Sequence, residues 1–397
     1  MLIYTLLMAI ILALGYIKPN NSKTKRKIYL ITVFGLLIFI SAMRSQNVGT
    51  DLRNLYSHYY SSFKHVEWRK LQNVTKSGHW ELGFCILCKC LCYVTTDIQF
   101  FILVTSVLAI VPYAIFIYYN SEDVVFSSFF YLAFHIYTIG LNLVRQPIAV
   151  GIIIIGLGEL KRKHYLRFAI FVLLASLIHV SALIALLLIL LDKIRFNRNS
   201  VVKLTIFTIL IILGYSHLFS FLLKYTQLSE KYGFYEIGVK HAAGYITIHT
   251  LGMAVVPLFI LIVCILYYNN DSNYSEKNFF MIKRRILKLK GTKLRFGFDK
   301  EIIYWSEDIL IYVCYIVMIL RIGAFIINVS SRMSYYFIPF LMIAFPHAIN
   351  KVSNYKNKLI INSIIYFGLI VFFFYIGIFQ ANRLWGVTPY EFCFQLK

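Results

Sequence analysis

A small set of charged side chains lies at the ends of apolar segments, where ionisable groups are rare. Each one costs roughly 2.5–3.5 kcal/mol at membrane depth, so each is a functional candidate. A guanidinium keeps its charge when it loses water and can donate two parallel hydrogen bonds to phosphate oxygens. Several arginines that face one compartment would therefore form an anion site. The set comprises Arg44, Asp51, Arg53, Glu81, Arg145, His179 and Arg332.

Arg145 lies within residues 142–147 (NLVRQP), where a polar step precedes Pro147. Proline is favoured in the first turn of a helix, so the spacing predicts a helix that begins here. The N-terminus of a helix offers free N–H groups and a partial positive charge, and both favour an anion. We expect Arg145 to bind a phosphate there; the alternative is that such arginines only reach the interface and pair with lipid. Arg53 and Arg321 are interpreted as structural.

Two residues could act as a general base. Asp51 follows Gly49, and a glycine permits a tight turn that aims the carboxylate back at the membrane surface. It is either a salt-bridge partner or a base. His179 titrates near neutrality and could accept a proton from an attacking hydroxyl, although a lone histidine is usually a hydrogen-bonded structural residue. The sequence leaves the choice between Asp51 and His179 open.

The elements that must position these residues are membrane helices. The chain is 59% hydrophobic and 14% charged, with a mean hydropathy of +0.71, whereas a soluble chain is roughly a quarter charged. Apolar runs long enough to span a bilayer recur from Leu2 to Gln380. We expect one polytopic, all-α membrane domain over residues 1–397. The first run, residues 2–17, lacks a basic leader region and a cleavage site, so we expect a retained helix.

The basic residues carry topological information. The formal net charge is +23, but these residues cap apolar runs instead of forming a soluble basic face, so we expect no nucleic-acid partner. The positive-inside rule places the strongest clusters in the cytoplasm. These clusters are residues 18–27, 161–167, 193–203, 277–300 and 351–358.

Counting the crossings between these clusters gives a helical bundle of about twelve crossings. An odd number of crossings before residue 161 requires that residues 81–94, a short run with Lys89, form a re-entrant or interfacial helix. Residues 165–195 begin and end in basic clusters, so they should form a hairpin of two short helices that turns near His179 and Ser181. The count places loops of about residues 44–80 and 224–248, and the tail 382–397, outside, and a basic loop of about 270–304 inside.

The cysteines could suggest a metal site. Cys85, Cys88 and Cys92 would share one helical face, but no second ligand cluster with zinc spacing accompanies them. We interpret them as small apolar residues of a membrane helix. We therefore expect no metal, no cofactor and no disulfide framework.

Five short motifs, taken in order, resemble the EpsG family of bacterial exopolysaccharide and O-antigen repeat polymerases, which are Wzy-like membrane glycosyltransferases. Residues 201–305 carry no motif of that family. The motifs are Arg44 with residues 48–51 (VGTD) and Tyr56, residues 81–84 (ELGF), residues 142–149 (NLVRQPIA), residues 178–183 (IHVSAL), and residues 331–333 (SRM) with Tyr336.

The resemblance implies an enzyme of the cytoplasmic (inner) membrane that acts at its outer face. It would transfer a growing O-antigen, exopolysaccharide or capsule glycan from undecaprenyl pyrophosphate onto the terminal sugar of another lipid-linked repeat. Arg145 and Arg332, helped by Arg44, would hold the leaving pyrophosphate without a metal, and His179 or Asp51 would be the base. The other expected substrate contacts are Glu81, Asn142, Gln146 and Tyr336. The expected partners are the lipid-linked oligosaccharide, membrane lipid, a chain-length regulator and a flippase.

Two other functions are compatible with the same residues. A transporter or flippase of lipid-linked glycans would also present cations to pyrophosphate, although the polar groups here gather on one face and not at the midplane, where alternating access would favour them. A membrane acyltransferase acting on sugars is the third possibility. The sequence leaves open the repeat unit, the linkage, and whether configuration is inverted or retained.

Overall fold

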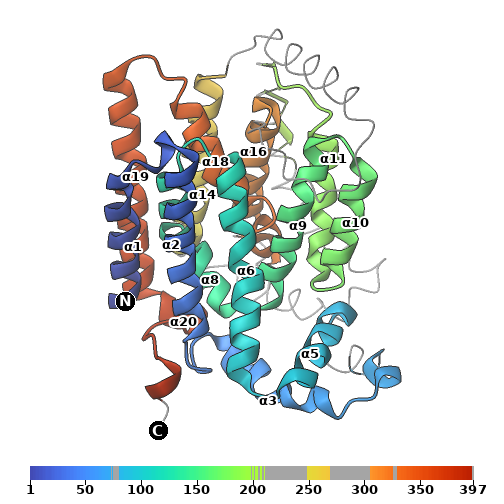
Figure 1. Ribbon diagram of the computed structural model, residues 1–397. Helices are drawn as coiled ribbons and strands as arrows, with labels where there is room; N and C mark the ends of the chain where they lie inside the picture. The colour runs from blue at the N-terminus through green and yellow to red at the C-terminus, as the bar shows by residue number, and fades with distance from the viewer. Residues whose placement is uncertain are drawn as a thin grey trace.

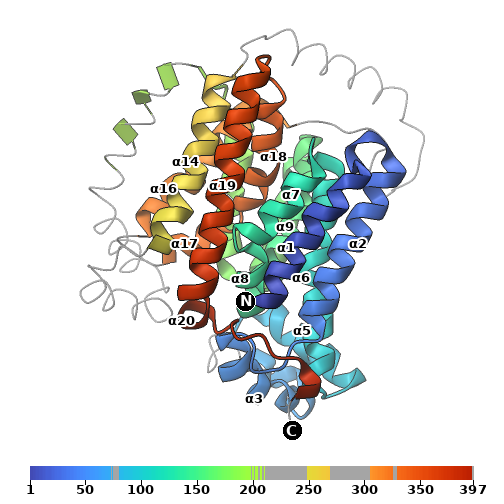
Figure 2. The same ribbon diagram turned by 90° about the vertical axis from the view of Figure 1, so that its left-hand side faces the viewer.

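Helices form nearly all of the computed structural model. It describes residues 1–72, 74, 80–197, 248–268, 305–324 and 329–395, together with residues 199, 200, 202, 203, 206, 207 and 210. The long helices run side by side as a bundle (Figures 1 and 2), as the predicted all-α class requires. Their bounds are α1 (Leu2–Leu14), α2 (Lys23–Ala42), α6 (Ile98–Asn120), α7 (Val124–Ala133), α8 (Ile136–Asn142), α9 (Arg145–Lys161), α10 (Tyr165–Ser176), α11 (Leu187–Leu191), α14 (Ile248–Leu266), α16 (Glu307–Gly323), α18 (Ile338–Ile349) and α19 (Tyr355–Phe379).

Short polar side chains begin several of these helices. The Ser22 hydroxyl accepts a hydrogen bond from the Lys25 N–H (3.1 Å) at the start of α2, and Asp97 accepts one from the Gln99 N–H (2.9 Å) at the start of α6. Asp123 does the same for α7. Each cap satisfies a backbone donor that has no partner within its helix. These polar residues therefore determine where the apolar helices begin.

Two of the described helices, α6 and α19, are long and apolar enough to cross a membrane. The pair α7 and α8 makes a third candidate, bent by 46° at a break where His135 has a φ of 60°. Shorter apolar helices, among them α1, α10 and α18, stand beside these (Figure 2). The chain is thus a helical membrane protein, and the count of about twelve crossings stays a prediction.

Contacts between the connecting segments distinguish two ends of the bundle. The connection between α9 and α10 and the end of α18 lie at the upper end in Figure 1. Lys163, in that connection, has its Nζ 2.6 Å from Asp192 Oδ1, and His347, in α18, has its Nδ1 2.5 Å from Glu122 Oε1. The cluster at residues 277–300 lies outside the described residues. The basic segments found at the upper end are residues 18–27, 161–167 and 351–358. The gathering of basic segments at one end is the arrangement that the positive-inside rule predicts.

The predicted hairpin is present. Its first arm is α10, and its second arm begins as a 3₁₀ helix, η6 (Val180–Leu186), and continues as α11. The ion pair between Lys163 and Asp192 joins the two free ends of the arms. His179 precedes η6 in extended conformation, with φ −153° and ψ 115°. The imidazole is therefore placed at the turn, on the end of the bundle opposite the basic segments.

Residues 81–94 form the short helix α5 (Leu82–Val94) at the lower end of the bundle. It lies below the long helices, beside residues 57–70, and not between them (Figure 1). Lys89 is buried there and its Nζ donates to the Phe63 carbonyl (3.3 Å). α5 is shorter than a spanning helix, as the sequence predicted, and the choice between a re-entrant and an interfacial helix stays a prediction. The predicted cysteine face, Cys85, Cys88 and Cys92, is buried.

The predicted outer loop of residues 44–80 is a string of short helical turns over its described part. These are a π turn, η3 (Leu52–Tyr56), followed by α3 (Ser57–Tyr59), η4 (Ser61–Lys64) and η5 (Trp68–Lys70). The predicted loops at 224–248 and 270–304 lie outside the described residues, except that α14 begins at residue 248. The chain ends, after α20 (Ala381–Trp385), in an extended segment at the lower end of the bundle (Figure 2).

Candidate active site

The turn that carries Asp51 is held against the end of α8. Gly49 has a φ of 103°, a conformation that favours glycine, and a Cβ there would lie 2.7 Å from the Leu141 carbonyl oxygen. The Thr50 hydroxyl and the Asp51 N–H both donate to Asn142 Oδ1, each at 2.9 Å. The tight turn predicted from Gly49 is therefore present, and the amide of Asn142 fixes its backbone.

Arg145 is the first residue of α9, where the sequence predicted the start of a helix. Its Nε donates to the Tyr56 hydroxyl (3.0 Å), and its Nη1 donates to Glu81 Oε2 (2.6 Å). The other oxygen of Glu81 accepts from the Val180 N–H (3.2 Å). Glu81 thus ties the start of α9 to the hairpin turn beside His179. Arg145 Nη2 makes no hydrogen bond within the described residues, so one donor nitrogen remains for a ligand.

The hairpin turn brings His179 close to Tyr336, which lies in the turn before α18. His179 Nδ1 lies 2.7 Å from the Ser181 hydroxyl, and that hydroxyl lies 3.0 Å from the hydroxyl of Tyr336. Ser181 sits between the two rings and can donate to one while accepting from the other. This hydrogen-bonded row fixes the orientation of the imidazole.

Gln146 connects α9 to α17 (Val329–Ser334), the short helix that carries Arg332. Its Nε2 donates to the Arg332 carbonyl (2.5 Å). The Arg332 side chain is exposed and forms no hydrogen bond or ion pair with the part of the chain that the structure describes. The backbone of Arg332 is therefore held in place while its guanidinium remains available.

The carboxylate of Asp51 lies close to both arginines without pairing to either. It is partly buried, and no hydrogen bond reaches it from the described residues. Burial raises the pKa of Asp51 above its ordinary value of 3.8, and the charges of Arg332 and Arg145 oppose this rise. A carboxylate with a raised pKa and no partner is suited to accept a proton from a hydroxyl.

Arg44 lies apart from this group. Its side chain is only 2% exposed, and its Nη1 donates to the carbonyl of Ser41 (2.6 Å) and to the hydroxyls of Ser41 (2.7 Å) and Ser106 (3.1 Å). Ser41 belongs to the last turn of α2, where the helix dipole leaves a partial negative charge that a cation stabilises. Arg44 therefore caps α2, and its predicted contact with a pyrophosphate stays a prediction.

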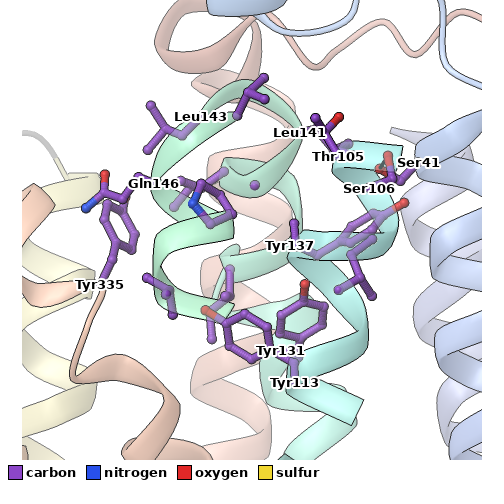
Figure 3. Close-up of a pocket in the computed structure, with 18 of the residues that line it drawn as sticks. Ser41, Thr105, Ser106, Tyr113, Tyr131, Tyr137, Leu141, Leu143, Gln146 and Tyr335 are labelled. Carbon is purple, nitrogen blue, oxygen red and sulfur yellow. Dashed lines mark hydrogen bonds between the residues drawn. The ribbon is translucent and has the colours of Figure 1, made fainter. Parts of the chain in front are cut away.

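A small cavity of about 30 Å³ lies between Arg44 and Gln146. Figure 3 shows Tyr113 and Tyr131 at one end of it, the serine and threonine hydroxyls at another, and Gln146 beside Tyr335. Such a volume holds no more than a water molecule or two, so it cannot admit a sugar.

The predicted residues share the lower end of the bundle, and Arg44, which follows the end of α2 there, makes none of the hydrogen bonds described for the others. The others come together although they are distant in sequence, and they are Asp51, Glu81, Asn142, Arg145, Gln146, His179, Arg332 and Tyr336. Sequence reasoning missed the roles of Tyr56, which holds Arg145, and Ser181, which holds His179. Both residues belong to the motifs that resemble the family, but the sequence does not show which side chain each of them contacts.

The pair of Glu81 and Arg145 should contribute to stability. We expect Glu81→Gln to lower the free energy of unfolding by about 2 kcal/mol, because the amide leaves a largely buried guanidinium without its countercharge. The two side chains are 9% and 20% exposed, so water screens them little. Glu67→Gln is the matched control, since Glu67 and Lys70 are 65% and 64% exposed and such surface pairs contribute about 0–1 kcal/mol. Thermal unfolding in detergent measures both; equal shifts would contradict this interpretation.

Comparison with known proteins agrees with the motifs. No curated protein and no solved structure matches the chain. The model of the EpsG family matches residues 27–392, nearly the whole chain. That span includes every residue of the site described above. The chain therefore belongs to the EpsG family, a Wzy-like polymerase family.

Proposed function

We propose that this chain is a polysaccharide polymerase that joins oligosaccharide repeat units carried on undecaprenyl pyrophosphate at the outer face of the cytoplasmic membrane. The product would be an O-antigen, an exopolysaccharide or a capsule glycan. The observation that carries the proposal is the half-buried carboxylate of Asp51, which has no hydrogen-bond partner among the described residues and is influenced by the charges of Arg332 and Arg145. Glycosyl transfer from a pyrophosphate needs such a base and such cations within one site.

The proposed reaction is a direct glycosyl transfer. A hydroxyl of the incoming repeat attacks the anomeric carbon of the growing glycan and forms the new C–O bond. The bond between that carbon and the pyrophosphate oxygen breaks, and its electron pair leaves with undecaprenyl pyrophosphate. Asp51 accepts the hydroxyl proton. Its carboxylate has no hydrogen-bond partner among the described residues and its pKa is raised, and both favour it over His179, whose Nδ1 is engaged by Ser181.

Arg332 is proposed as the principal ligand of the pyrophosphate. Its guanidinium is exposed and unpaired within the described residues, so it can turn toward two phosphate oxygens at once. Arg145 adds its unused Nη2 from the start of α9, where the helix dipole also favours an anion. A flippase would use the same cations but needs no base. A sugar acyltransferase also needs a base for the sugar hydroxyl, so the reaction product must distinguish it from a polymerase.

The outer-face part of the proposal can be tested by thiol labelling. In a variant without the seven native cysteines, we expect Arg332→Cys and His179→Cys to react with a membrane-impermeant maleimide added to intact cells. Lys351→Cys, at the opposite end of the bundle, should react only after the cells are permeabilised. Labelling of positions 332 and 179 from the cytoplasm alone would contradict the proposed sidedness.

Reconstitution tests the reaction itself. Purified protein in liposomes that contain the lipid-linked repeat should produce a ladder of longer glycans. Translocated but unextended repeats would identify a flippase, and acylated repeats would identify an acyltransferase. Either result in place of a ladder would contradict the polymerase proposal.

A further inference from the structure

The C-terminal segment lies directly against the turn that carries Asp51. The Gly49 N–H donates to the Gly386 carbonyl (2.9 Å), and the Ser45 N–H donates to the Glu391 carbonyl (2.8 Å). The Cys393 N–H donates to the Met43 carbonyl (2.9 Å), and Arg44 and Phe392 form an antiparallel bridge. Backbone groups of residues 43–49 and of the C-terminal segment thus satisfy one another just before Asp51.

We propose that this segment, residues 385–393, is a positioning element that sets the place of the Asp51 carboxylate in the site. The inference rests on the proposed function of Asp51 as the base. No other group orients the carboxylate within the described residues, because only the Asp51 N–H and not its carboxylate is hydrogen-bonded. Its place therefore depends on the backbone of residues 49–51, and that backbone lies between α8 and the C-terminal segment.

The turn of residues 49–51 has little free space on either side. On one side, a Cβ at Gly49 would lie 2.7 Å from the Leu141 carbonyl oxygen. On the other side, Gly386 has a φ of 62°, and a Cβ there would lie 2.9 Å from Cγ2 of Thr50. A side chain at either glycine must push the turn, and the hydroxyl of Thr50 would then leave Asn142. This close approach therefore requires glycine at both positions, because each residue has a positive φ and no room for a side chain.

The segment is itself anchored to the first helices of the bundle. The Tyr4 hydroxyl of α1 donates to the Val387 carbonyl (2.8 Å), and the Tyr390 hydroxyl donates to the Ile40 carbonyl of α2 (2.6 Å). Val387 is fully buried. Because the anchors lie in α1 and α2, the segment transmits the position of these helices to residues 49–51. Figure 2 shows the segment passing beneath α1 toward the short helices of residues 52–70.

Gly386→Ala tests this role, with Gly368→Ala as the matched control. A Cβ at Gly368 meets nothing within 4 Å, and the residue lies in α19 far from the turn. In the full-length protein, we expect Gly386→Ala to increase hydrogen exchange at the amides of Gly49 and Asp51 and to lower kcat about 10-fold with little change in KM. The acid limb of the pH–rate profile should move to lower pH, because a displaced Asp51 is more hydrated. The control should change none of these.

A second substitution tests whether Gly386→Ala acts by displacing the turn or by disturbing the fold in general. Thr50→Ser keeps the hydroxyl that bonds Asn142 and removes the methyl group that the new Cβ would strike. The double variant should therefore recover a part of both the exchange protection and kcat. If Gly386→Ala does not accumulate, Tyr390→Phe, which removes the bond to Ile40 without adding atoms, should also raise exchange at residues 45–51.

Two results would overturn the inference. One is unchanged exchange at Gly49 and Asp51 in both Gly386→Ala and Tyr390→Phe. The other is a loss of activity in Gly386→Ala with neither a shift of the pH profile nor recovery by Thr50→Ser. Hydrogen exchange needs no substrate, so it decides whether the segment holds the turn even if the protein makes no glycan ladder. Hydrogen exchange therefore tests the role of the C-terminal segment, and glycan synthesis tests the proposed function, so the failure of one can be distinguished from the failure of the other.

Discussion

Replacing Asp51 by Asn should lower the rate of chain growth by about 10²- to 10⁴-fold, the range that a positioned general base contributes. Asparagine has nearly the same shape, and its backbone N–H can still bond to Asn142 Oδ1. The substitution therefore removes the proton acceptor and leaves the turn in place. Initial rates of glycan extension in liposomes measure the effect. A rate within a few-fold of wild type would exclude Asp51 as the base and transfer that role to His179.

The same variant should gain thermal stability at neutral pH. Because burial raises the folded-state pKa of Asp51 above its value of 3.8 in an unfolded chain, the native protein binds this proton more tightly. The stability that Asp51 contributes is fully present below that unfolded-state value and is lost as the pH rises through the folded-state pKa. Asp51→Asn carries no charge, so it should melt at a higher temperature than wild type at neutral pH and at a similar temperature near pH 3.8. A lower melting temperature at neutral pH would indicate disruption and not loss of a base.

Arg332→Ala should lower kcat by about 10²- to 10³-fold, as removal of a donor to a developing negative charge does. Arg332 forms no hydrogen bond or ion pair within the described residues, although its charge acts on Asp51, so its loss should change the melting temperature little. Arg332→Lys keeps the charge but loses the paired donors, so it should recover only part of the rate. Extension assays and thermal unfolding of the same preparations separate the two effects.

Arg53→Ala is the matched control for Arg332→Ala. Arg53 is an exposed arginine at the same end of the bundle, and its Nε donates only to the neighbouring Asn54 (3.3 Å). It should retain wild-type chain growth, because it supplies charge without belonging to the site. Similar losses of activity in the two variants would mean that the activity depends on the total positive charge at this end of the bundle and not on Arg332 in particular.

Much of the site could be predicted from residue types and from counting the membrane crossings between basic segments. The basic segments predict which ends of the helices lie together, and that alone requires the hairpin that brings His179 to the same end as Asp51. Pro147 predicts the start of α9 at Arg145, and Gly49 predicts the turn before Asp51. These inferences succeed because charge asymmetry and backbone restrictions act locally.

Other features depend on contacts between distant segments. The sequence does not predict the hydrogen bonds of Arg44 to Ser41 and Ser106, because these two serines lie in different helices, α2 and α6. The C-terminal segment carries no motif of its own, and its role depends on Gly386 meeting Thr50 far along the chain. Composition and periodicity do not encode such pairings, because they describe the exposure of a residue and not its neighbour.

The central claim is that the residues around Asp51 and Arg332 transfer a glycan from undecaprenyl pyrophosphate. Its most direct test measures, in liposomes with the purified protein and the lipid-linked repeat, the undecaprenyl pyrophosphate released and the glycosidic bonds formed. The account predicts that both increase together, with one carrier lipid released for each new bond, and that both stop in Asp51→Asn. Bonds formed without release of the carrier, or release without extension, would contradict it.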